Sequence, residues 1–151
     1  MAKPIIVSDG PFKGWLTWPE RDTPSFLHTV GMPFFRKTSD DTAEFIAETA
    51  PWHVNDGDNL HGGYLMTIID AGLFAVSRAV SDVGGVTISC NTEFLNAGNP
   101  HKPIHGVGRV MRETGKLMFV QGSLDQDGVP ICAYSGVLRK IVKPFDMIGD
   151  A

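Results

Sequence analysis

The segment that most constrains the fold is residues 61–80, HGGYLMTIIDAGLFAVSRAV, because apolar residues occupy nearly every face of it in a helical projection. Such a helix must be enclosed by protein rather than lie on a surface. Twenty residues of helix span roughly 30 Å, enough to cross a whole small domain. We therefore expect one long central helix over residues 61–80, with the rest of the chain folded around it.

The glycines near this segment indicate where the helix begins and ends. Gly62 and Gly63 are unfavourable inside a helix, so we place them at its N-terminal entry, where backbone N–H groups are unpaired and a ligand can approach closely. Gly84 and Gly85 are expected to end the segment. The apolar run 64–80 is shorter than the ~20 residues that a bilayer requires and contains charged residues, which favours a buried helix over a membrane span.

The segments on either side of this helix show strand patterns. A Thr cap, Pro24 and Gly31 predict a short helix over residues 24–30. Residues 32–49 form two extended runs split by Ser-Asp-Asp, which predicts a hairpin. After the helix, residues 85–95 alternate, and residues 105–142 form three further runs joined near 113–116 and at Asp127-Gly128, a strong hairpin signal. The alternation predicts Ile88, Cys90 and Phe94 on one side of their strand, with Thr87, Ser89, Asn91 and Glu93 on the other.

The order of these elements predicts the fold class. A hairpin, one long buried helix and four strands in a meander make an α+β domain, and the short connections require an antiparallel sheet. The 151 residues, 42% of them hydrophobic, suit one domain over 1–151, with about 1–22 as an irregular arm that carries Trp15 and Trp18. A sheet wrapped around one helix leaves an uncovered edge, which predicts a homodimer or a dimer of dimers.

Charge and cysteine content exclude several classes of function. The net charge is −4 and no basic run is present, so we expect neither nucleic acid nor a membrane as partner. Only about three consecutive apolar residues precede Ser8, too few for a signal peptide, which predicts a cytoplasmic protein. Cys90 and Cys132 lack metal-binding spacing and are expected to be free, buried thiols. The His101 to His105 spacing suits a helical metal site, but Pro103 argues against a helix, so no metal is expected.

The chemistry of the chain centres on Asp70, a carboxylate on an otherwise apolar helix. Burial penalises its charge, so either hydrogen bonds satisfy Asp70 or it serves as a base or nucleophile in a dry cleft. Thr67 and Ser77 would form a thin polar stripe with it. The amides of Gly62 and Gly63, at the positive end of the helix dipole, suit an oxyanion, yet Asp70 lies too far along the helix to act on the same atom within one subunit.

Structural interpretations of the same residues stay open at this point. Asp70 could simply bond to a neighbouring hydroxyl, Gly62 and Gly63 could form a tight chain entry, His61 could be structural, and Asn55 could be a turn former.

The run HVNDGDNLHGGYLMTIIDA, residues 53–71, resembles the signature of the hotdog-fold acyl-CoA thioesterases, in particular the phenylacetate-pathway-like branch of the 4-hydroxybenzoyl-CoA thioesterase superfamily. In that family an Asn precedes His-Gly-Gly by six residues and an Asp follows the His by nine. Asn55, His61 and Asp70 hold those spacings. The resemblance covers roughly residues 24–142 and implies a hotdog fold, an antiparallel sheet wrapped around one long central helix.

The resemblance also implies roles for these residues and no separate cofactor, with coenzyme A (CoA) only as part of the substrate. Asp70 would be the general base or nucleophile, and Thr87 would assist it. Gly62 would donate its N–H to the thioester carbonyl, with Gly63 beside it; Asn55 would hold the water or the carbonyl, and His61 would order the helix entry. The family's sites form across a dimer interface, so Asp70 of one subunit would face Gly62 of the other.

Binding of the substrate's phosphates and acyl group is less defined. Scattered basic residues serve in the family, and Arg112, Lys116, Arg139 and Lys140 are the candidates here. The acyl preference depends on where the larger apolar side chains lie, namely Trp15, Trp18, Phe34, Phe35, Met66 and Phe74. Two alternatives are a non-catalytic acyl-CoA-binding module and a hotdog enoyl-CoA hydratase, the latter because Asn99-Pro100-His101 resembles part of a hydratase motif.

Overall fold

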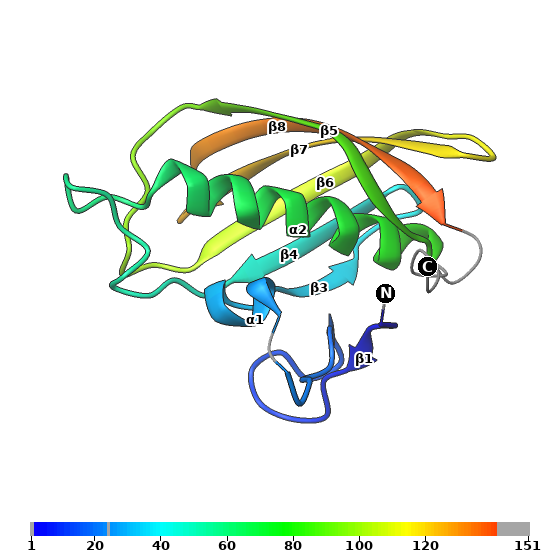
Figure 1. The fold of residues 1–151 in the computed structure, drawn as a ribbon, viewed down its shortest axis with the longest axis horizontal. Coiled ribbons are helices and arrows are strands. Elements are labelled where there is room, and N and C mark those ends of the chain that lie inside the picture. The colour runs from blue at the N-terminus through cyan, green and yellow to red at the C-terminus, as the bar shows by residue number, and fades with distance from the viewer. Residues whose placement is uncertain (1, 24, 142–151) are drawn as a thin grey trace, which may run out of the picture.

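One long helix, α2 (Gly62–Ser81), lies across one face of an eight-stranded sheet in which every registered strand pair is antiparallel (Figure 1). The computed structural model describes residues 2–23 and 25–141. The buried side chains of α2 point into the sheet, so helix and sheet share one hydrophobic core. This is the α+β architecture with a central helix that the sequence predicts.

The strands confirm both predicted hairpins. The run 32–49 forms β3 and β4, and Asp127-Gly128 forms a turn between β7 and β8 in which both residues have positive φ, 52° and 78°. The order across the sheet is β1-β2-β3-β4-β6-β7-β8-β5. The strands are β1 (Ile5–Ile6), β2 (Leu16–Thr17), β3 (Phe34–Lys37), β4 (Thr42–Ala47), β5 (Gly84–Phe94), β6 (Ile104–Glu113), β7 (Leu117–Gln126) and β8 (Val129–Ile141).

The predicted four-strand meander is wrong for its first strand. Strand β5 does not pair with β6; it pairs with β8 at the outer edge of the sheet, and β6 lies between β4 and β7. After α2 the chain enters the edge strand β5, and residues 95–103 then carry it back across the sheet to β6. Within the described residues the other edge of β5 has no partner strand.

The N-terminal arm is more regular than predicted. Strands β1 and β2 extend the sheet beyond β3, with Leu16 registered against Phe35. Helix α1 (Phe26–Val30) begins later than expected, with Ser25 as its N-cap, and Pro24 lies outside the described residues. Gly31 ends α1 as predicted, at φ 106°, a backbone conformation that favours glycine.

The C-terminal end of α2 also differs from the prediction. Asp82 is the C-cap, in the left-handed conformation at φ 49°, while Gly84 and Gly85 begin β5. A Cβ at Gly85 would overlap the backbone carbonyl of Arg139 on β8, and one at Gly84 would crowd the Arg78 guanidinium. These two glycines therefore permit the close approach of β5 to its neighbours rather than end the helix.

Helix α2 is long and apolar enough to cross a membrane by length and composition alone. Its 20 residues equal the length that a bilayer requires, so length does not exclude a span as the sequence argument assumed. The helix packs on β3, β4, β5 and β6, and ten of its residues are buried there. The core of this domain accounts for its apolar character.

The ring of Phe45 fills a space that two glycines leave open. Phe45 on β4 is fully buried, and a Cβ at either Gly72 of α2 or Gly106 of β6 would overlap its ring. The helix therefore crosses the sheet closely at Gly72, which fixes the height of the neighbouring Asp70 above the strands.

Replacing Gly72 by Ala is expected to lower the free energy of unfolding by about 1–3 kcal/mol, because the overlap with Phe45 outweighs the better helix propensity of Ala. Adding Phe45→Leu to Gly72→Ala should recover part of that loss. Chemical denaturation of the two single variants and the double variant measures the coupling. Gly115→Ala, in open space, is the control and should change little. Strictly additive effects of Gly72→Ala and Phe45→Leu would contradict this packing.

Candidate active site

The carboxylate of Asp70 is half-buried and bonded to one side chain of the neighbouring strand. The Thr87 hydroxyl of β5 donates to Asp70 Oδ1 over 2.6 Å. A register shift between Thr87 and Ser89 breaks the strict alternation predicted for this strand. As a result Thr87 bonds to a helix residue and Cys90 packs on the core, while Ile88 is 57% exposed. The bulge thus sets the Thr87 hydroxyl against Asp70.

The expected polar stripe along α2 does not form around Asp70. The Thr67 hydroxyl donates to the Gly63 carbonyl over 2.9 Å, and the Ser77 hydroxyl to the Val83 carbonyl over 2.7 Å. Both hydroxyls therefore serve the backbone. Within residues 2–23 and 25–141, Thr87 is the one donor to the Asp70 carboxylate, whose second oxygen is free to accept a proton or a hydrogen bond.

Both cysteines are free, as predicted. Burial raises the pKa of the Cys132 thiol to about 11. Burial, together with the nearby Asp70 carboxylate, raises the pKa of Cys90. Both therefore stay protonated at neutral pH, and Cys90 is a weak nucleophile beside Asp70.

At the start of α2, His61 is the N-cap and its side chain occupies one of the two glycine amides. His61 Nδ1 accepts the Gly63 N–H over 2.9 Å, which orders the helix entry. The predicted role of Gly63 as a second donor to substrate is therefore not supported by this geometry. No acceptor within the described part of the chain contacts the Gly62 N–H, which stays available at the positive end of the helix dipole.

Asn55 closes the loop that precedes the helix. Its Oδ1 accepts the N–H of Gly57 over 2.9 Å and of Asn59 over 3.3 Å, so its carbonyl oxygen acts as a turn former. The loop nevertheless brings Asn55 close to Gly62, because both line one cavity of about 410 Å³ together with Phe94. Asn55 and the free amide thus share one side of the helix entry.

Asp70 lines a different cavity, of about 510 Å³, beside α1 and the N-terminal arm. Eight residues of helix separate it from Gly62, or about 12 Å along the axis. One chain therefore presents two half-sites, an acid with its hydroxyl partner and a helix N-terminus with its loop. The two halves do not meet within this chain.

The predicted phosphate-binding residues lie away from the helix entry. The turn that carries Lys116 is at the opposite end of α2, where the Ser81 hydroxyl donates to Glu113 over 2.7 Å. Arg112 lines a groove formed by Ser89 and Asn91 of β5 and by strand residues 119–121 and 135–137. Lys140 is paired with Glu113 and the Thr114 carbonyl at 2.6 and 2.9 Å, so it is not a free cation, whereas Arg139 is exposed.

The predicted acyl-pocket residues divide into two groups. Trp18, Met66 and Phe74 line the cavity beside Asp70. Trp15, Phe34 and Phe35 do not, since the Arg36 guanidinium covers Trp15, Phe34 stacks on Phe12, and Phe35 is fully buried. Sequence reasoning missed Phe26, His28 and Met32 in the lining, and only the position of α1 over the central helix could have shown it.

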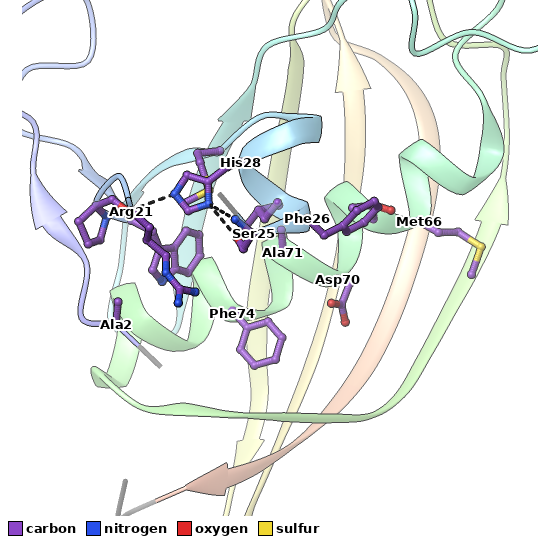
Figure 2. A pocket seen from close by; sticks show the side chains of 14 residues that line it. Ala2, Arg21, Ser25, Phe26, His28, Met66, Asp70, Ala71 and Phe74 are labelled. Carbon is purple, nitrogen blue, oxygen red and sulfur yellow. Dashed lines mark hydrogen bonds between the residues drawn. The ribbon is translucent and has the colours of Figure 1, made fainter. Parts of the chain in front are cut away.

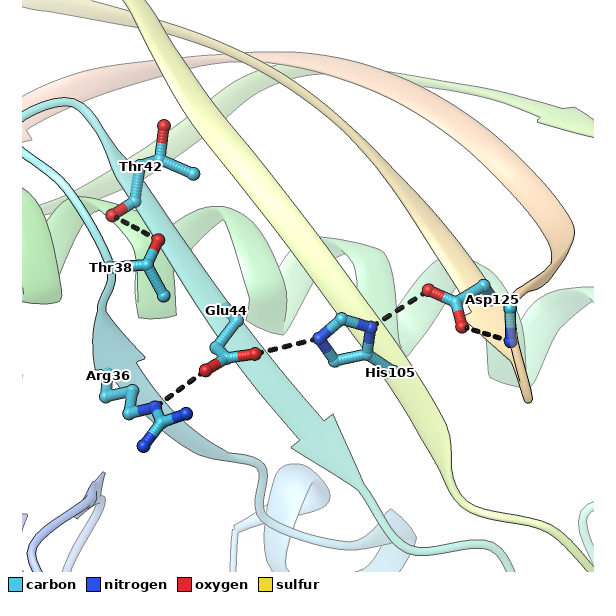
Figure 3. A network of polar contacts seen from close by, with 7 residues as sticks. Arg36, Thr38, Thr42, Glu44, His105 and Asp125 are labelled. Atoms are coloured by element: carbon cyan, nitrogen blue, oxygen red, sulfur yellow. Dashed lines mark hydrogen bonds and ion pairs between the residues drawn. The ribbon is translucent and has the colours of Figure 1, made fainter.

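A polar cluster lies on strands β3, β4, β6 and β7, centred on a histidine that the sequence weighed as a metal ligand (Figure 3). His105 is on β6, not on a helix, and bonds to Asp125 at 2.9 Å and to Glu44 at 3.0 Å. Burial lowers the pKa of His105, but these two carboxylates outweigh it and raise that pKa above 6.5. Burial raises the pKa of Glu44, but hydrogen bonds from Arg36 and His105 hold it below 4.5.

The stabilisation by His105 is expected to depend on pH. Because its folded-state pKa is raised, its contribution is complete below pH 6.5 and is lost as the pH rises through the raised value. The contribution of Glu44 is complete above pH 4.5 and is lost as the pH falls through its lowered pKa. Denaturation of the native protein and of His105→Gln across pH measures the difference between their free energies of unfolding. This difference should be largest between pH 4.5 and pH 6.5. A difference that does not change with pH would contradict the ion pairing.

Comparison with solved structures confirms the hotdog architecture. A hypothetical thioesterase protein from Streptococcus pneumoniae, solved with coenzyme A, is similar with a TM-score of 0.64 and 19% identity over 71% of this chain and 84% of that one. Thioesterase superfamily member 2 of zebrafish matches with 0.67 and 20% over 78% and 88%. The PaaI protein from the phenylacetic acid degradation operon of Escherichia coli matches with 0.61 and 15% over 66% and 72%. These identities show a shared fold.

Family membership comes from the sequence itself. No curated protein matches the chain. The family model described as the thioesterase superfamily matches residues 57–133, just over half of the 151 residues. The matched region contains Gly62, Asp70 and Thr87, and it includes the helix entry, the central helix, strands β5 to β7 and the start of β8. The chain therefore belongs to the thioesterase superfamily, with the hotdog fold and the thioester hydrolase class of that family.

Proposed function

We propose that this protein hydrolyses acyl-CoA thioesters to the free acid and CoA, with Asp70 driving attack on the thioester carbonyl. The observation that carries this proposal is the half-buried Asp70 carboxylate, held by Thr87 at the edge of an apolar cavity with one oxygen left free. A carboxylate in such a setting suits proton abstraction from water or direct attack. A binding module alone would not need a carboxylate oxygen left free at this position.

The second half of the proposed site comes from a partner subunit. Strand β5 is an 11-residue edge strand with exposed apolar side chains, Val86, Ile88 and Phe94 among them. A free, apolar edge of this length favours pairing with another strand. Antiparallel pairing of two β5 strands about a two-fold axis would join two sheets into one and cover those side chains.

We infer the register of that pairing from contacts within one chain. Thr87 bonds to Asp70, and the Phe94 ring lies beside Gly62, only 3.3 Å from where a Cβ would be. If Thr87 lies opposite the partner subunit's Phe94, Asp70 comes to the partner subunit's Gly62. The two-fold axis then passes between Cys90 and Asn91. This arrangement unites the two half-sites and creates two equivalent active sites per dimer.

In this site each group has one task. The Gly62 N–H, with the dipole of α2 behind it, polarises the thioester carbonyl and stabilises the negative charge that develops on its oxygen. Asp70 takes the proton of the attacking water, or attacks the carbonyl itself, and Thr87 holds the carboxylate in place. Attack forms the new C–O bond and a tetrahedral intermediate, and collapse of that intermediate breaks the C–S bond and releases CoA as its thiolate, which takes up the proton of the water. If Asp70 itself attacks, the product is an acyl-aspartyl anhydride, which water then hydrolyses to the free acid and the regenerated carboxylate. Asn55, beside Gly62, would orient the water or the carbonyl through its amide group.

The nature of the substrate is supported by the structural neighbours. The Streptococcus pneumoniae protein was solved with coenzyme A and a protein from Streptococcus mutans was solved bound to acetyl-CoA. Antiparallel pairing would bring the end of the sheet that carries Arg112 and Lys116 toward the partner subunit's helix entry. Both cations are exposed, so they could meet the phosphates of CoA there. No separate cofactor enters this chemistry.

Release of thiol from a panel of alkyl- and aryl-CoA thioesters tests the proposal. Hydrolysis of at least one member by the native protein is the expected result. If acyl-CoA binds but none is cleaved, the protein is a binding module and the proposal fails. If an enoyl-CoA is hydrated without release of thiol, the protein is a hydratase and the proposal fails in a different way.

A further inference from the structure

The cavity beside Asp70 extends away from the carboxylate toward the N-terminal arm (Figure 2). Its volume is about 510 Å³, within the range of small-molecule sites. Met66 and Phe74 line it from α2, Phe26 from α1, and Trp18 from the arm. Figure 2 shows Asp70 toward one end, Phe74 alongside, and Arg21 and Ala2 of the arm at the other end.

Most of the residues that line the cavity are apolar, and Asp70 and Arg21 are the charged exceptions among them. Met66, Asp70 and Phe74 follow each other at intervals of one helical turn, so this side of the cavity runs about 12 Å along α2. Asp70 is the one carboxylate among the described lining residues. Arg21 is exposed at the far end and therefore solvated. An apolar group that starts at Asp70 can follow this surface without burying a charge.

The wall opposite α2 is held in place by specific contacts. The Trp18 ring packs on the buried Phe35 ring at 4.8 Å between centroids. His28 Nδ1 lies 2.7 Å from the Ser25 hydroxyl, and His28 Nε2 lies 3.3 Å from the Pro19 carbonyl, which ties α1 to the arm. The arm therefore presents a preformed surface to the cavity, and ligand binding does not need to order it.

We propose that this cavity is the acyl pocket, that it takes an uncharged, apolar acyl group such as a medium-chain or aryl-alkyl group, and that Trp18 of the arm limits the length of that group. The inference rests on the proposed function, since it assigns the acyl half of the same substrate. The arm then determines specificity: the carbonyl is held at Asp70, and the apolar body of the acyl group lies between Phe74, Phe26 and Trp18.

The length dependence of kcat/KM follows from this geometry. Each methylene buried in the apolar pocket is expected to raise kcat/KM about fourfold, until the chain reaches the wall that contains Trp18. Beyond that length kcat/KM should fall, because a longer chain would have to displace a packed side chain. An acyl group of equal length that ends in a carboxylate should be a poor substrate, because the pocket offers its charge no buried partner.

The test compares two tryptophans of the arm. Trp18→Ala should move the maximum of kcat/KM to longer acyl groups. Trp15→Ala is the matched control, because Trp15 packs on Phe12 and under Arg36, outside the cavity, and its length profile should equal that of the native protein. An unchanged profile for Trp18→Ala, or a preference for acyl groups that end in a carboxylate, would overturn the inference.

Two further measurements test the acyl pocket even if Trp18→Ala does not fold. Phe26 is 68% exposed, so Phe26→Ala should fold even if Trp18→Ala does not, and it should raise KM for long acyl groups more than for short ones. Binding of acyl-CoA of increasing chain length to Asp70→Asn, measured by calorimetry, reports on the pocket without hydrolysis. Length-dependent binding with no cleavage by the native protein would refute the proposed function alone. If Trp18→Ala and Phe26→Ala both cleave acyl-CoA with the length profile of the native protein, the assignment of this cavity as the acyl pocket is refuted and the proposed function stands.

Discussion

Replacing Asp70 by Asn is expected to lower kcat for thioester hydrolysis at least about 10²-fold and to leave the fold intact. The amide has the shape of the carboxylate, and its Oδ1 can still accept the Thr87 hydroxyl that now bonds at 2.6 Å. What is lost is the ability to take a proton or to attack a carbonyl. Thiol release at saturating acyl-CoA measures kcat, and circular dichroism with size-exclusion chromatography checks the fold and the assembly.

A matched control lies on the same helix. Asp82→Asn makes the same chemical change at the exposed C-cap of α2, where the left-handed backbone at φ 49° also suits Asn. This variant should keep the native kcat. A folded Asp70→Asn protein with native kcat would show that Asp70 has only a structural role beside Thr87. A rise in KM alone would assign it to substrate binding instead.

Replacing Gly62 by Pro is expected to lower kcat about 10²- to 10³-fold, the usual cost of removing one oxyanion donor. Gly62 is the first residue of α2, a position where Pro is tolerated because the N–H there has no partner within the helix. His61 before it has φ −65° and ψ 135°, which suits a residue that precedes Pro. The substitution therefore removes the proposed donor and leaves the helix in place. Single-turnover thiol release measures the chemical step.

Gly62→Ala separates loss of the donor from added bulk. It keeps the N–H and adds a Cβ that would lie 3.3 Å from the Phe94 ring, which is 53% exposed and able to move. We expect a much smaller loss of kcat for Gly62→Ala than for Gly62→Pro. Equal losses in the two variants would indicate that crowding at Phe94, rather than the amide, controls the rate.

Much of the fold and part of the site were predictable because they depend on local sequence. The all-round apolar pattern predicted α2 to within one residue at its ends, and Asp127-Gly128 predicted the β7–β8 turn through its positive φ values. The spacing from Gly62 to Asp70 fixes the separation of the two half-sites, since both residues belong to one helix. These features depend on residues that are close together in the sequence, so they can be predicted without the tertiary structure.

Other features were set by contacts between segments far apart in the sequence. The position of β5 at the sheet edge depends on how α2 crosses the strands, and Gly84 and Gly85 serve packing against Arg78 and β8, so reading them as helix terminators was wrong. The bulge beside Thr87 overrode the predicted alternation. The sequence predicts Lys140 as a candidate cation for the phosphates of CoA, but in the fold its ammonium group is paired with Glu113.

The sequence by itself therefore determined the central helix, the hairpin turns and the spacing of the acid from the helix entry, because periodicity, capping and turn chemistry act over a few residues. Only the tertiary structure decided that a strand bulge sets the Thr87 hydroxyl against Asp70, that the Gly63 amide is bonded to His61, and that the arm lines the cavity beside Asp70. Such contacts depend on strand order and close packing, which couple residues that no local pattern connects.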